Sequence, residues 1–590
     1  MSQEQERHLT PSESPTVSTA RRPIFAIFEG GGAKGIAHVG AYAAADSMQL
    51  EFVGVAGASA GSIVASLIAV GFRPAEIFDP QCRSGDILST NQLTPLQLLG
   101  EKEWNAFVRA RRWAPVIAVT LLLSLLATLV CAEAGWKWLA RSAAALSIGL
   151  VVIAVRWLRS WLSKRGIFDP GRLQVELNRI LRERVKLAYA EAGRNPDEVP
   201  DKITFRDIQP ERTASFCRLK IVATDVSGQQ LRIFDHRTPD VVVAEAVAAS
   251  IAIPGVFKPA TIPSFEDPDA APGVPSFYAD GGLVSNLPVW SFAEEKLAAE
   301  RRMKNNAAIP VVAFTLEDLT PEPMPQDGVR HALRYFTRVI RTGIFGGQSV
   351  VQEFVPDLEV IRLRTALDVL RFDATWDEAK EAYTAGRNQA LARLRWSLDI
   401  KPRQSRELLK SAYDSVKKQL ADYYGGLGKP QAIHLRACVF EPIKALRQSS
   451  TTFVTAYRAT HAFNMEEDAD DRITLDAECP GVPEAFEQRS VTFLGPSHGA
   501  ARKVVMTKYE VALIRRTMNS GLCVPIFEDE EQWSVQEGER NQPVAVVSFD
   551  SDNDLSAFFT DSKLRTELLE SVIEATLGLS SLVSKPEWTQ

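Results

Sequence analysis

The chain has 590 residues, which is too long for one hydrophobic core and predicts roughly two to four domains. Its formal net charge of -6 lacks the basic excess of nucleic-acid-binding proteins, so we expect no nucleic-acid partner. The six cysteines are scattered, with no Cys-x-x-Cys pair and no histidine at metal-ligand spacing, which predicts a reducing compartment and no metal site.

A glycine-rich loop follows the first predicted strand. Residues 1–20 are polar and lack the apolar segment of a signal peptide, so we expect a disordered tail there. Residues 24–28 form the apolar strand, and the chain continues as EGGGAKGIAHVG, in which three glycines match G-x-G-x-x-G. Unpaired N–H groups at such a helix start attract an anion, either a nucleotide phosphate or an oxyanion formed during catalysis.

The second predicted strand, 52–56, argues against a nucleotide. A dinucleotide site requires an acidic residue at the end of this strand to bind the ribose hydroxyls, yet the strand ends in Gly-Ala-Ser. A Walker phosphate loop is excluded as well, because Lys34 is followed by Gly35 rather than by serine or threonine. We therefore expect the glycine-rich loop to bind another negative charge.

A candidate nucleophile lies between the second strand and a buried helix predicted for 62–70. Residues 57–61 read GASAG, which matches the nucleophile elbow G-x-S-x-G. The sharp turn exposes the serine oxygen, and Gly57 and Gly61 avoid steric collision beside it. Ser59 is therefore the predicted nucleophile. Its attack on an ester would produce an oxyanion, for which the backbone amides of the glycine-rich loop are suitable donors.

Two uncharged apolar stretches, at about 113–132 and 138–155, predict a transmembrane hairpin inserted over 99–165. Basic residues flank the pair on its outer sides and are scarce in the loop between them, so the positive-inside rule places both ends in the cytoplasm. Tryptophans near the ends of both stretches are typical of membrane interfaces. The short second stretch leaves open a hairpin that enters one leaflet, or a buried helical hairpin. The lipid bilayer is the expected partner.

Ser59 requires a base within hydrogen-bonding reach, and the strongest candidate follows a short aromatic stretch. Asp280-Gly281-Gly282 places an acid in a tight loop whose glycines allow another backbone segment to approach. His38 is expected to pack on the helix that leaves the glycine-rich loop, and Asp225 is expected to lie in a turn. Both are therefore weaker candidates, although an Asp-Gly-Gly sequence alone is also typical of an ordinary turn.

Three motifs, in this order, resemble the patatin-like phospholipase family. They are GGGAKG at 30–35, GASAG at 57–61 and DGG at 280–282. The stretches ATDVSG at 223–228 and AVAASIAIPGVFKP at 246–259 are also similar to that family. An ordered set of this kind is more specific than any one of its motifs.

The resemblance covers 22–98 and 166–398, and it implies a three-layer α/β/α hydrolase domain that the hairpin interrupts. It also implies a lipid acyl hydrolase with a Ser–Asp dyad, in which Ser59 attacks the acyl carbonyl and Asp280 accepts its proton. No cofactor is implied. The loop residues that the resemblance assigns are the oxyanion hole at Gly30, Gly31 and Gly32, and the loop support at Lys34 and Gly35.

The C-terminal third predicts a separate unit. A linker helix is predicted for 401–424, before the glycine-rich break GGLGKP. Residues 431–586 alternate strand and helix patterns and resemble a GAF sensor domain, chiefly on GVPEAF at 481–486 and SGLCVPI at 520–526. The resemblance implies an α+β regulatory domain that binds a small molecule. A dimerisation module without a ligand, and with it a homodimer, stays open.

We therefore expect a membrane-anchored lipid acyl hydrolase of phospholipase A or lysophospholipase type, acting on membrane phospholipid. Its catalytic and C-terminal domains would lie on the cytoplasmic side of a two-span protein, with the C-terminal domain as regulator. One alternative is a membrane signalling or ligand-sensing protein with a vestigial hydrolase site. Another is a thioesterase or peptidase that uses the same serine and aspartate. The sequence leaves acyl-chain, positional and head-group preference undetermined.

Overall fold

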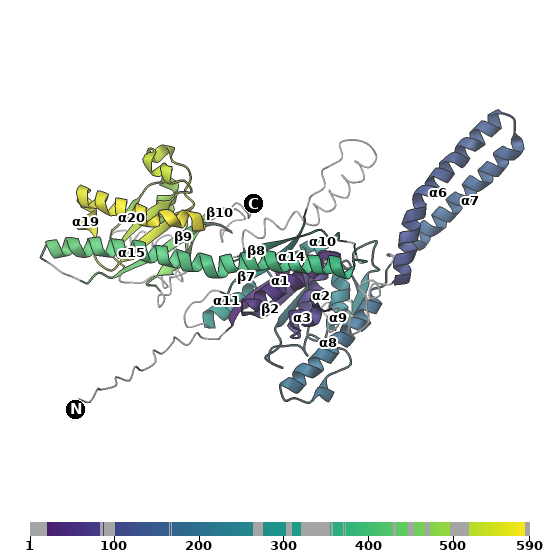
Figure 1. Ribbon diagram of the computed structural model, residues 1–590, viewed down its shortest axis with the longest axis horizontal. Coiled ribbons are helices and arrows are strands. Elements are labelled where there is room, and N and C mark those ends of the chain that lie inside the picture. The colour runs from purple at the N-terminus through teal and green to yellow at the C-terminus, as the bar shows by residue number, and fades with distance from the viewer. Residues whose placement is uncertain are drawn as a thin grey trace, which may run out of the picture.

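The computed structural model describes residues 21–583, apart from 83–86, 88–100, 165, 167, 264–274, 303–308, 320–354, 356–357, 370, 372, 429–431, 447–452, 466–472 and 496–517. The tail predicted for residues 1–20 lies outside the described residues. Two β-sheets organise the described chain, and a long helical segment runs from one to the other (Figure 1).

The first sheet has eight strands in the order β5-β6-β3-β2-β1-β7-β8, with β4 paired to β3. Five neighbouring strands are parallel, namely β1 (Arg22–Phe28), β2 (Leu50–Ala58), β3 (Arg218–Asp225), β7 (Val311–Asp318) and β8 (Leu358–Thr365). The antiparallel strands are β4 (Gln230–Phe234), β5 (Ala260–Pro263) and β6 (Pro275–Ala279). β1 and β2 contain the two predicted strands, whose near-continuous apolar runs are typical of strands buried on both faces.

Alternate residues of β1 enter two different cores, one on each face of the first sheet. Ile24, Ala26 and Phe28 belong to the larger core, whereas Phe25 and Ile27 belong to the smaller one. The longer helices that contribute to the larger core are α1 (Ile36–Ser47), α2 (Ala60–Ala69), α8 (Gly171–Glu191), α9 (Val243–Ser250) and α14 (Trp376–Arg395). On the other face, α11 (Ala293–Arg302) and the segment before it contribute to the smaller core. This layering agrees with the α/β fold predicted for the first unit.

Loops and short elements surround the carboxyl ends of the parallel strands. β1 leads through the glycine-rich loop into η1 (Gly32–Gly35), and β2 leads directly into α2. β6 leads into α10 (Gly282–Ser285), and the remaining short helices are α3 (Pro74–Ile77) and η2 (Pro196–Glu198). Open α/β sheets bind ligands at the carboxyl ends of their strands, so we expect the functional site at this edge.

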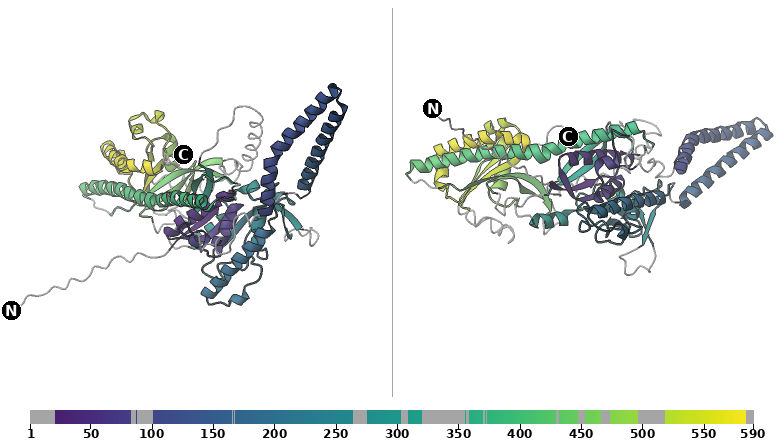
Figure 2. Two further views of the ribbon diagram at one scale, coloured as in Figure 1. Left: turned by 45° about the vertical axis from the view of Figure 1, so that its right-hand side comes forward. Right: turned by 60° about the horizontal axis from the view of Figure 1, so that its bottom comes forward.

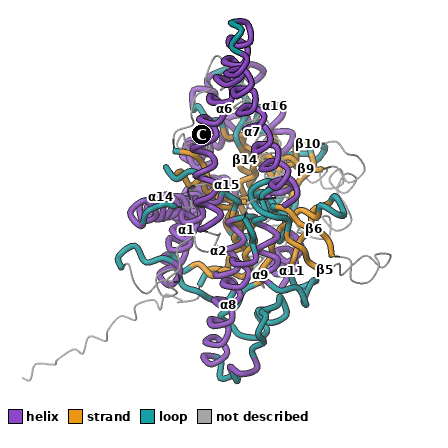
Figure 3. Tube along the Cα trace, turned by 90° about the vertical axis from the view of Figure 1, so that its right-hand side faces the viewer, coloured by secondary structure: helices purple, strands orange, loops and turns teal. Residues whose placement is uncertain are grey.

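The inserted stretch forms a helical hairpin that extends away from both sheets (Figures 1, 2 and 3). Its helices are α6 (Glu101–Glu133) and α7 (Lys137–Lys164). Between them, the buried hydroxyls of Ser124 and Ser147 are hydrogen-bonded at 2.8 Å. Many apolar side chains on the other faces of the hairpin are exposed, including Leu122 and Leu129.

The prediction of two membrane spans, at about 113–132 and 138–155, is wrong. Among the residues that the structure describes, no helix combines the length and the apolar character that crossing a bilayer requires. In α7 the uncharged stretch between Arg141 and Arg156 holds only residues 142–155, whereas a span needs about 20 predominantly apolar residues. The expected localisation, a two-span membrane protein with both domains on the cytoplasmic side, is therefore wrong as well.

The second sheet has six antiparallel strands in the order β11-β10-β9-β14-β13-β12. They are β9 (Leu435–Leu446), β10 (Phe453–Phe463), β11 (Thr474–Asp476), β12 (Thr492–Leu494), β13 (Ser520–Ile526) and β14 (Ala545–Ser551). α15 (Lys401–Gly426) and α20 (Ser562–Val583) pack on one face, and α16 (Val482–Gln488) packs on the other. The shorter helices are η4 (Glu530–Ser534), η5 (Glu537–Glu539) and α19 (Ser556–Thr560).

One continuous helical segment joins the two units. α14 packs against α1 in the first unit and continues through a π-helical turn, η3 (Trp396–Ile400), into α15. The helix predicted for 401–424 is present as α15, and its side chains of Leu409, Val416 and Leu420 lie in the core of the second unit. The connection between the units is therefore a helix that is packed at both ends.

α1 and α14 approach each other so closely that each requires a glycine. A Cβ added at Gly40 would lie 2.0 Å from Tyr383 O, and one added at Gly386 would lie 2.3 Å from Ala37 O. We predict that Gly40→Ala destabilises the protein by about 1–3 kcal/mol, because the two backbones must separate to admit the methyl group. Chemical denaturation followed by circular dichroism measures the loss.

Gly425→Ala is the matched control. An added Cβ at this position of α15 meets no heavy atom within 4 Å, so the change should leave stability unaltered or raise it by up to about 1 kcal/mol. Equal denaturation midpoints for Gly40→Ala and wild type would contradict the close helix contact.

Candidate active site

Ser59 lies in a strained turn between β2 and α2. Its backbone has φ +48° and ψ -126°, a conformation that residues with a side chain rarely adopt and that typifies a nucleophile elbow. A Cβ at Gly57 would lie 2.3 Å from the Gly61 carbonyl, and one at Gly61 would lie 2.2 Å from Phe28 O. Gly57 is therefore required for the turn to close, and Gly61 is required for it to pack against β1.

Ser250, at the end of α9, connects the turn of Ser59 to the loop of Asp280. The Ser59 amide donates to Ser250 Oγ at 2.9 Å, and Ser250 Oγ donates to Val222 O at 2.6 Å. The Ser250 carbonyl accepts from Gly281 N at 3.1 Å. Sequence reasoning did not single out Ser250, although it lies within the stretch 246–259 that resembles the family. That stretch was the signal that could have identified it.

Asp280 follows β6 and is buried beside Ser59. Its Oδ1 accepts from Gly282 N at 2.7 Å, while Oδ2 is buried without a hydrogen-bond partner. Burial raises the pKa of Asp280 to about 6, against the opposing effects of the nearby Ser59 hydroxyl and of the Gly282 amide. The structure thus brings together the serine and the acid that the sequence singled out, with one carboxyl oxygen unoccupied.

The glycine-rich loop passes directly over Ser59. A Cβ at Gly30 would lie 2.9 Å from the Ser59 Cβ, so only glycine fits at this point. The Gly30 amide donates to Asn286 O at 3.2 Å and is therefore engaged. In the described part of the chain, the amides of Gly31 and Gly32 donate no hydrogen bond to another group of the protein.

Lys34 and Gly35 hold the end of this loop. The buried Lys34 ammonium donates to Asp318 Oδ1 at 2.5 Å, which ties η1 to the end of β7. A Cβ at Gly35 would lie 3.3 Å from the Ala60 Cβ, so the loop also packs closely on the start of α2.

A second buried carboxyl, Glu29, lies just before the loop. Its Oε1 accepts from Asn286 Nδ2 at 2.9 Å, and its Oε2 accepts from Leu316 N at 2.7 Å. Asn286 Nδ2 also donates to Gly30 O at 3.2 Å. Burial raises the pKa of Glu29 to about 7, although the Leu316 amide and Asn286 oppose that shift. Sequence reasoning assigned no role to Glu29, which directly precedes GGGAKG, or to Asn286, which lies four residues after Gly282.

His38 and Asp225 form hydrogen bonds to backbone groups other than those of Ser59. His38 is fully buried on α1, its Nε2 bonds to Glu29 O at 2.9 Å, and burial lowers its pKa to about 4. Asp225 accepts from Gly228 N at 2.8 Å and so closes the turn after β3. Packing and turn roles, as expected from the sequence, account for both residues.

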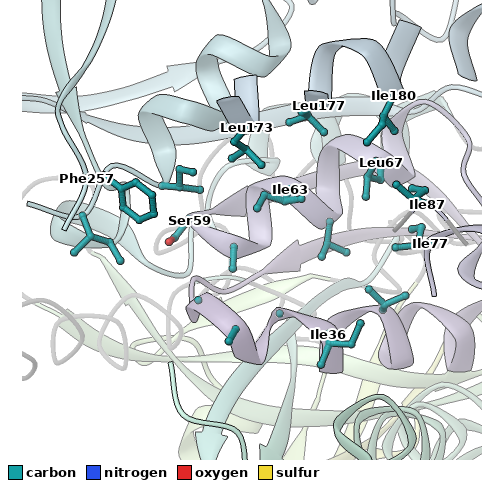
Figure 4. A pocket seen from close by; sticks show the side chains of 18 residues that line it. Ile36, Ser59, Ile63, Leu67, Ile77, Ile87, Leu173, Leu177, Ile180 and Phe257 are labelled. Carbon is teal, nitrogen blue, oxygen red and sulfur yellow. The ribbon is translucent and has the colours of Figure 1, made fainter. Parts of the chain in front are cut away.

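An apolar cavity of about 250 Å³ opens beside the Ser59 hydroxyl (Figure 4). α2 forms one wall, and α8 and α1 contribute the others. Ile63, Leu67, Leu173 and Leu177 line it, and Phe257 lies near Ser59. The arrangement suits a reaction at a carbonyl that carries a long apolar substituent.

Residues 26–293 match the sequence model of the family described as patatin-like phospholipase. The uncharacterized protein YqhO of Bacillus subtilis strain 168 is 23% identical over 319 residues, which are 54% of this chain and 79% of YqhO. The match to the family model reaches from β1 past the Asp280 loop, so it contains all three sequence motifs.

Two solved structures are also similar, at low identity. VipD from Legionella pneumophila is 16% identical with a TM-score of 0.31, over 64% of this chain and 67% of VipD. ExoU from Pseudomonas aeruginosa, solved in complex with SpcU, is 16% identical with a TM-score of 0.27, over 69% of this chain and 65% of ExoU. TM-scores this low carry no argument about the family, so the family assignment rests on the match to the sequence model. Residues 26–293 form a patatin-like phospholipase domain.

Proposed function

We propose that this protein is a lipid acyl hydrolase that cleaves carboxylic esters of phospholipid through Ser59 and Asp280. The patatin-like phospholipase domain supports a lipid hydrolase function. The observation that carries the proposal is the convergence, at one point, of a serine on a strained turn, a buried carboxyl with an unoccupied oxygen, and an apolar cavity.

In the proposed reaction, Ser59 Oγ attacks the acyl carbonyl while Asp280 Oδ2 accepts the hydroxyl proton. The new Oγ–C bond places negative charge on the former carbonyl oxygen, and the Gly31 and Gly32 amides donate to it. The alkoxide leaves as the C–O ester bond breaks, and it takes the proton back from Asp280. Water then hydrolyses the acyl-serine, with Asp280 accepting a proton from the water and returning it to Oγ.

Glu29 and Lys34 are assigned supporting roles in this proposal. Glu29 accepts from both Asn286 and β7, and Lys34 pairs with Asp318 at the end of β7. Together they hold the two ends of the glycine-rich loop. Donors that are already oriented stabilise a developing charge without reorganisation at the moment of reaction.

The C-terminal unit is proposed to be a GAF-like regulatory domain over 431–586. Its six-stranded antiparallel sheet, with helices on both faces, supports an α+β sensor unit. The helical segment through η3 provides a direct connection, because α14 contacts α1, the helix that follows the glycine-rich loop. A ligand that shifts α15 would therefore act on an element adjoining the proposed catalytic residues.

We predict that Ser59→Ala and Asp280→Asn each lower kcat/KM by at least about 10³-fold, because each removes one half of the proton transfer. The measurement is the release of fatty acid from mixed phospholipid vesicles, with the products identified by mass spectrometry. A fluorophosphonate probe should label wild type at Ser59 and leave Ser59→Ala unlabelled.

The matched control is Asp225→Asn, the same exchange at a buried turn carboxyl, which should change kcat/KM by less than about threefold. An unlabelled wild-type protein without activity would favour the alternative of a vestigial site in a signalling protein. Release of thiols or amines in preference to fatty acids from esters would favour a thioesterase or peptidase.

We predict that kcat/KM falls about tenfold per pH unit below pH 6 and is level above pH 7. The pKa of Asp280 is raised to about 6, so the carboxyl is protonated below that pH and cannot accept the serine proton. Stopped-time assays with a soluble ester between pH 4.5 and 8 give the profile. A profile without a fall on the acid side would remove Asp280 as the base.

We predict that Glu29→Gln lowers kcat about 10- to 100-fold with little change in KM. The amide of glutamine can replace only one of the two acceptor oxygens, so the loop loses a fixed contact and its donors move. Glu317→Gln is the control, since this neighbouring carboxylate on β7 is partly exposed and pairs with Arg362 and Arg364. Equal kinetics for Glu29→Gln and Glu317→Gln would contradict the supporting role.

A further inference from the structure

The cavity beside Ser59 has one polar end and one apolar end. Among the described residues that line it, Ser59 alone carries a polar side chain. Figure 4 shows Ser59 near Phe257, while the side chains at the opposite end are Leu67, Ile77, Ile87 and Ile180. The cavity is therefore a channel that leads away from the proposed nucleophile.

Among the described residues, core side chains line the far end together with Ile87. Leu67, Ile77 and Ile180 are only 6–7% exposed and belong to the main hydrophobic core of the first unit. The next residue after Ile77 is Phe78, whose ring packs against Tyr383 of α14. A longer channel would require a rearrangement of this close-packed core, which is energetically costly.

Only an acyl chain suits this channel. The ester carbonyl must reach Ser59 Oγ, so the channel receives either the acyl chain or the alcohol part of the substrate. A phospholipid head group is polar and charged, and burial beyond Ser59 would leave it without partners. An alkyl chain instead gains stabilisation from every methylene that it buries there.

The helices that line the channel set its length. Ser59 and Leu67 are eight residues apart along α2, which places the far end about 12 Å from the hydroxyl at about 1.5 Å per residue. On α8 the lining residues run from Leu173 to Ile180, a similar length of about 10 Å. C–C bonds of about 1.5 Å at angles near 111° advance an extended chain by about 1.25 Å per carbon, so about eight to ten carbons fit.

We propose that this channel is an acyl-chain site for about eight to ten carbons, and that Leu67, Ile77 and Ile180 set its upper limit. The inference rests on the proposed function and adds the chain-length preference of the substrate. Longer chains must leave part of their length outside the channel, so they gain nothing from their additional carbons. Shorter chains leave apolar surface of the channel unfilled.

The first test measures kcat/KM for p-nitrophenyl esters with saturated chains of four to sixteen carbons. We expect kcat/KM to rise about fourfold per methylene up to eight to ten carbons and then to level or fall. A steady rise through sixteen carbons, or no dependence on length, would overturn the inference.

The second test changes the end of the channel at Ile180. Ile180→Phe shortens it, and we expect the ratio of kcat/KM for the ten-carbon ester to that for the four-carbon ester to fall about tenfold. Ile180→Ala lengthens it, and we expect the ratio of the twelve-carbon to the ten-carbon ester to rise. Leu187→Phe and Leu187→Ala are the controls, because Leu187 lies on the same helix and is 59% exposed. Unchanged ratios in both Ile180 variants would overturn the inference.

A binding measurement separates this inference from the proposed function. The shift in melting temperature of Ser59→Ala with free saturated fatty acids should be largest at eight to ten carbons, and Ile180→Phe added to it should move the maximum to shorter acids. If no ester is hydrolysed but this maximum appears, the proposed function fails and the acyl-chain site stands. If esters are hydrolysed but no maximum appears in either series, the acyl-chain site fails and the hydrolase stands.

Discussion

Backbone segments from three strands meet around Ser59 at distances that leave no room for a side chain, and the rest of the site depends on that approach. Gly61 packs against the carbonyl of Phe28 in β1, and Gly281 packs against that of Val222 in β3. Gly30 then lies over Ser59 itself. Because these contacts come from several directions, they hold Ser59 at a positive φ that an isolated turn would not retain.

Two buried carboxyls lie within this arrangement, and their hydrogen-bond partners separate their roles. Glu29 accepts from a side-chain amide and from a strand amide, so both of its oxygens are occupied. Asp280 accepts from one backbone amide and retains one oxygen without a partner. Burial raises the pKa of both carboxyls, but only Asp280 has an oxygen available for a proton from outside its own contacts. The first is suited to holding the loop, and the second to proton transfer.

Apolar patterning predicted helices more reliably than it predicted what those helices contact. The two apolar stretches of the insertion do form helices, α6 and α7, which touch each other through Ser124 and Ser147. They do not provide membrane spans in the described residues. α15 shows the same distinction, because a helix predicted as a connection places Leu409 and Leu420 in the core of the second unit. Periodicity identifies an apolar face but not the surface that covers it.

The sequence by itself determined the local geometry of the candidate site. Tight turns and close backbone approach require glycine, so the glycine-rich loop, the GASAG elbow and the DGG turn were readable from short motifs. Only the tertiary structure determined which distant groups join the site, namely Ser250, Asn286 and the side chains of the channel beside Ser59. Ser250 bonds to Ser59 across 191 positions and Asn286 to Glu29 across 257, and the channel combines side chains of α1, α2 and α8. Such groups are brought together by the packing of distant segments, which no local pattern records.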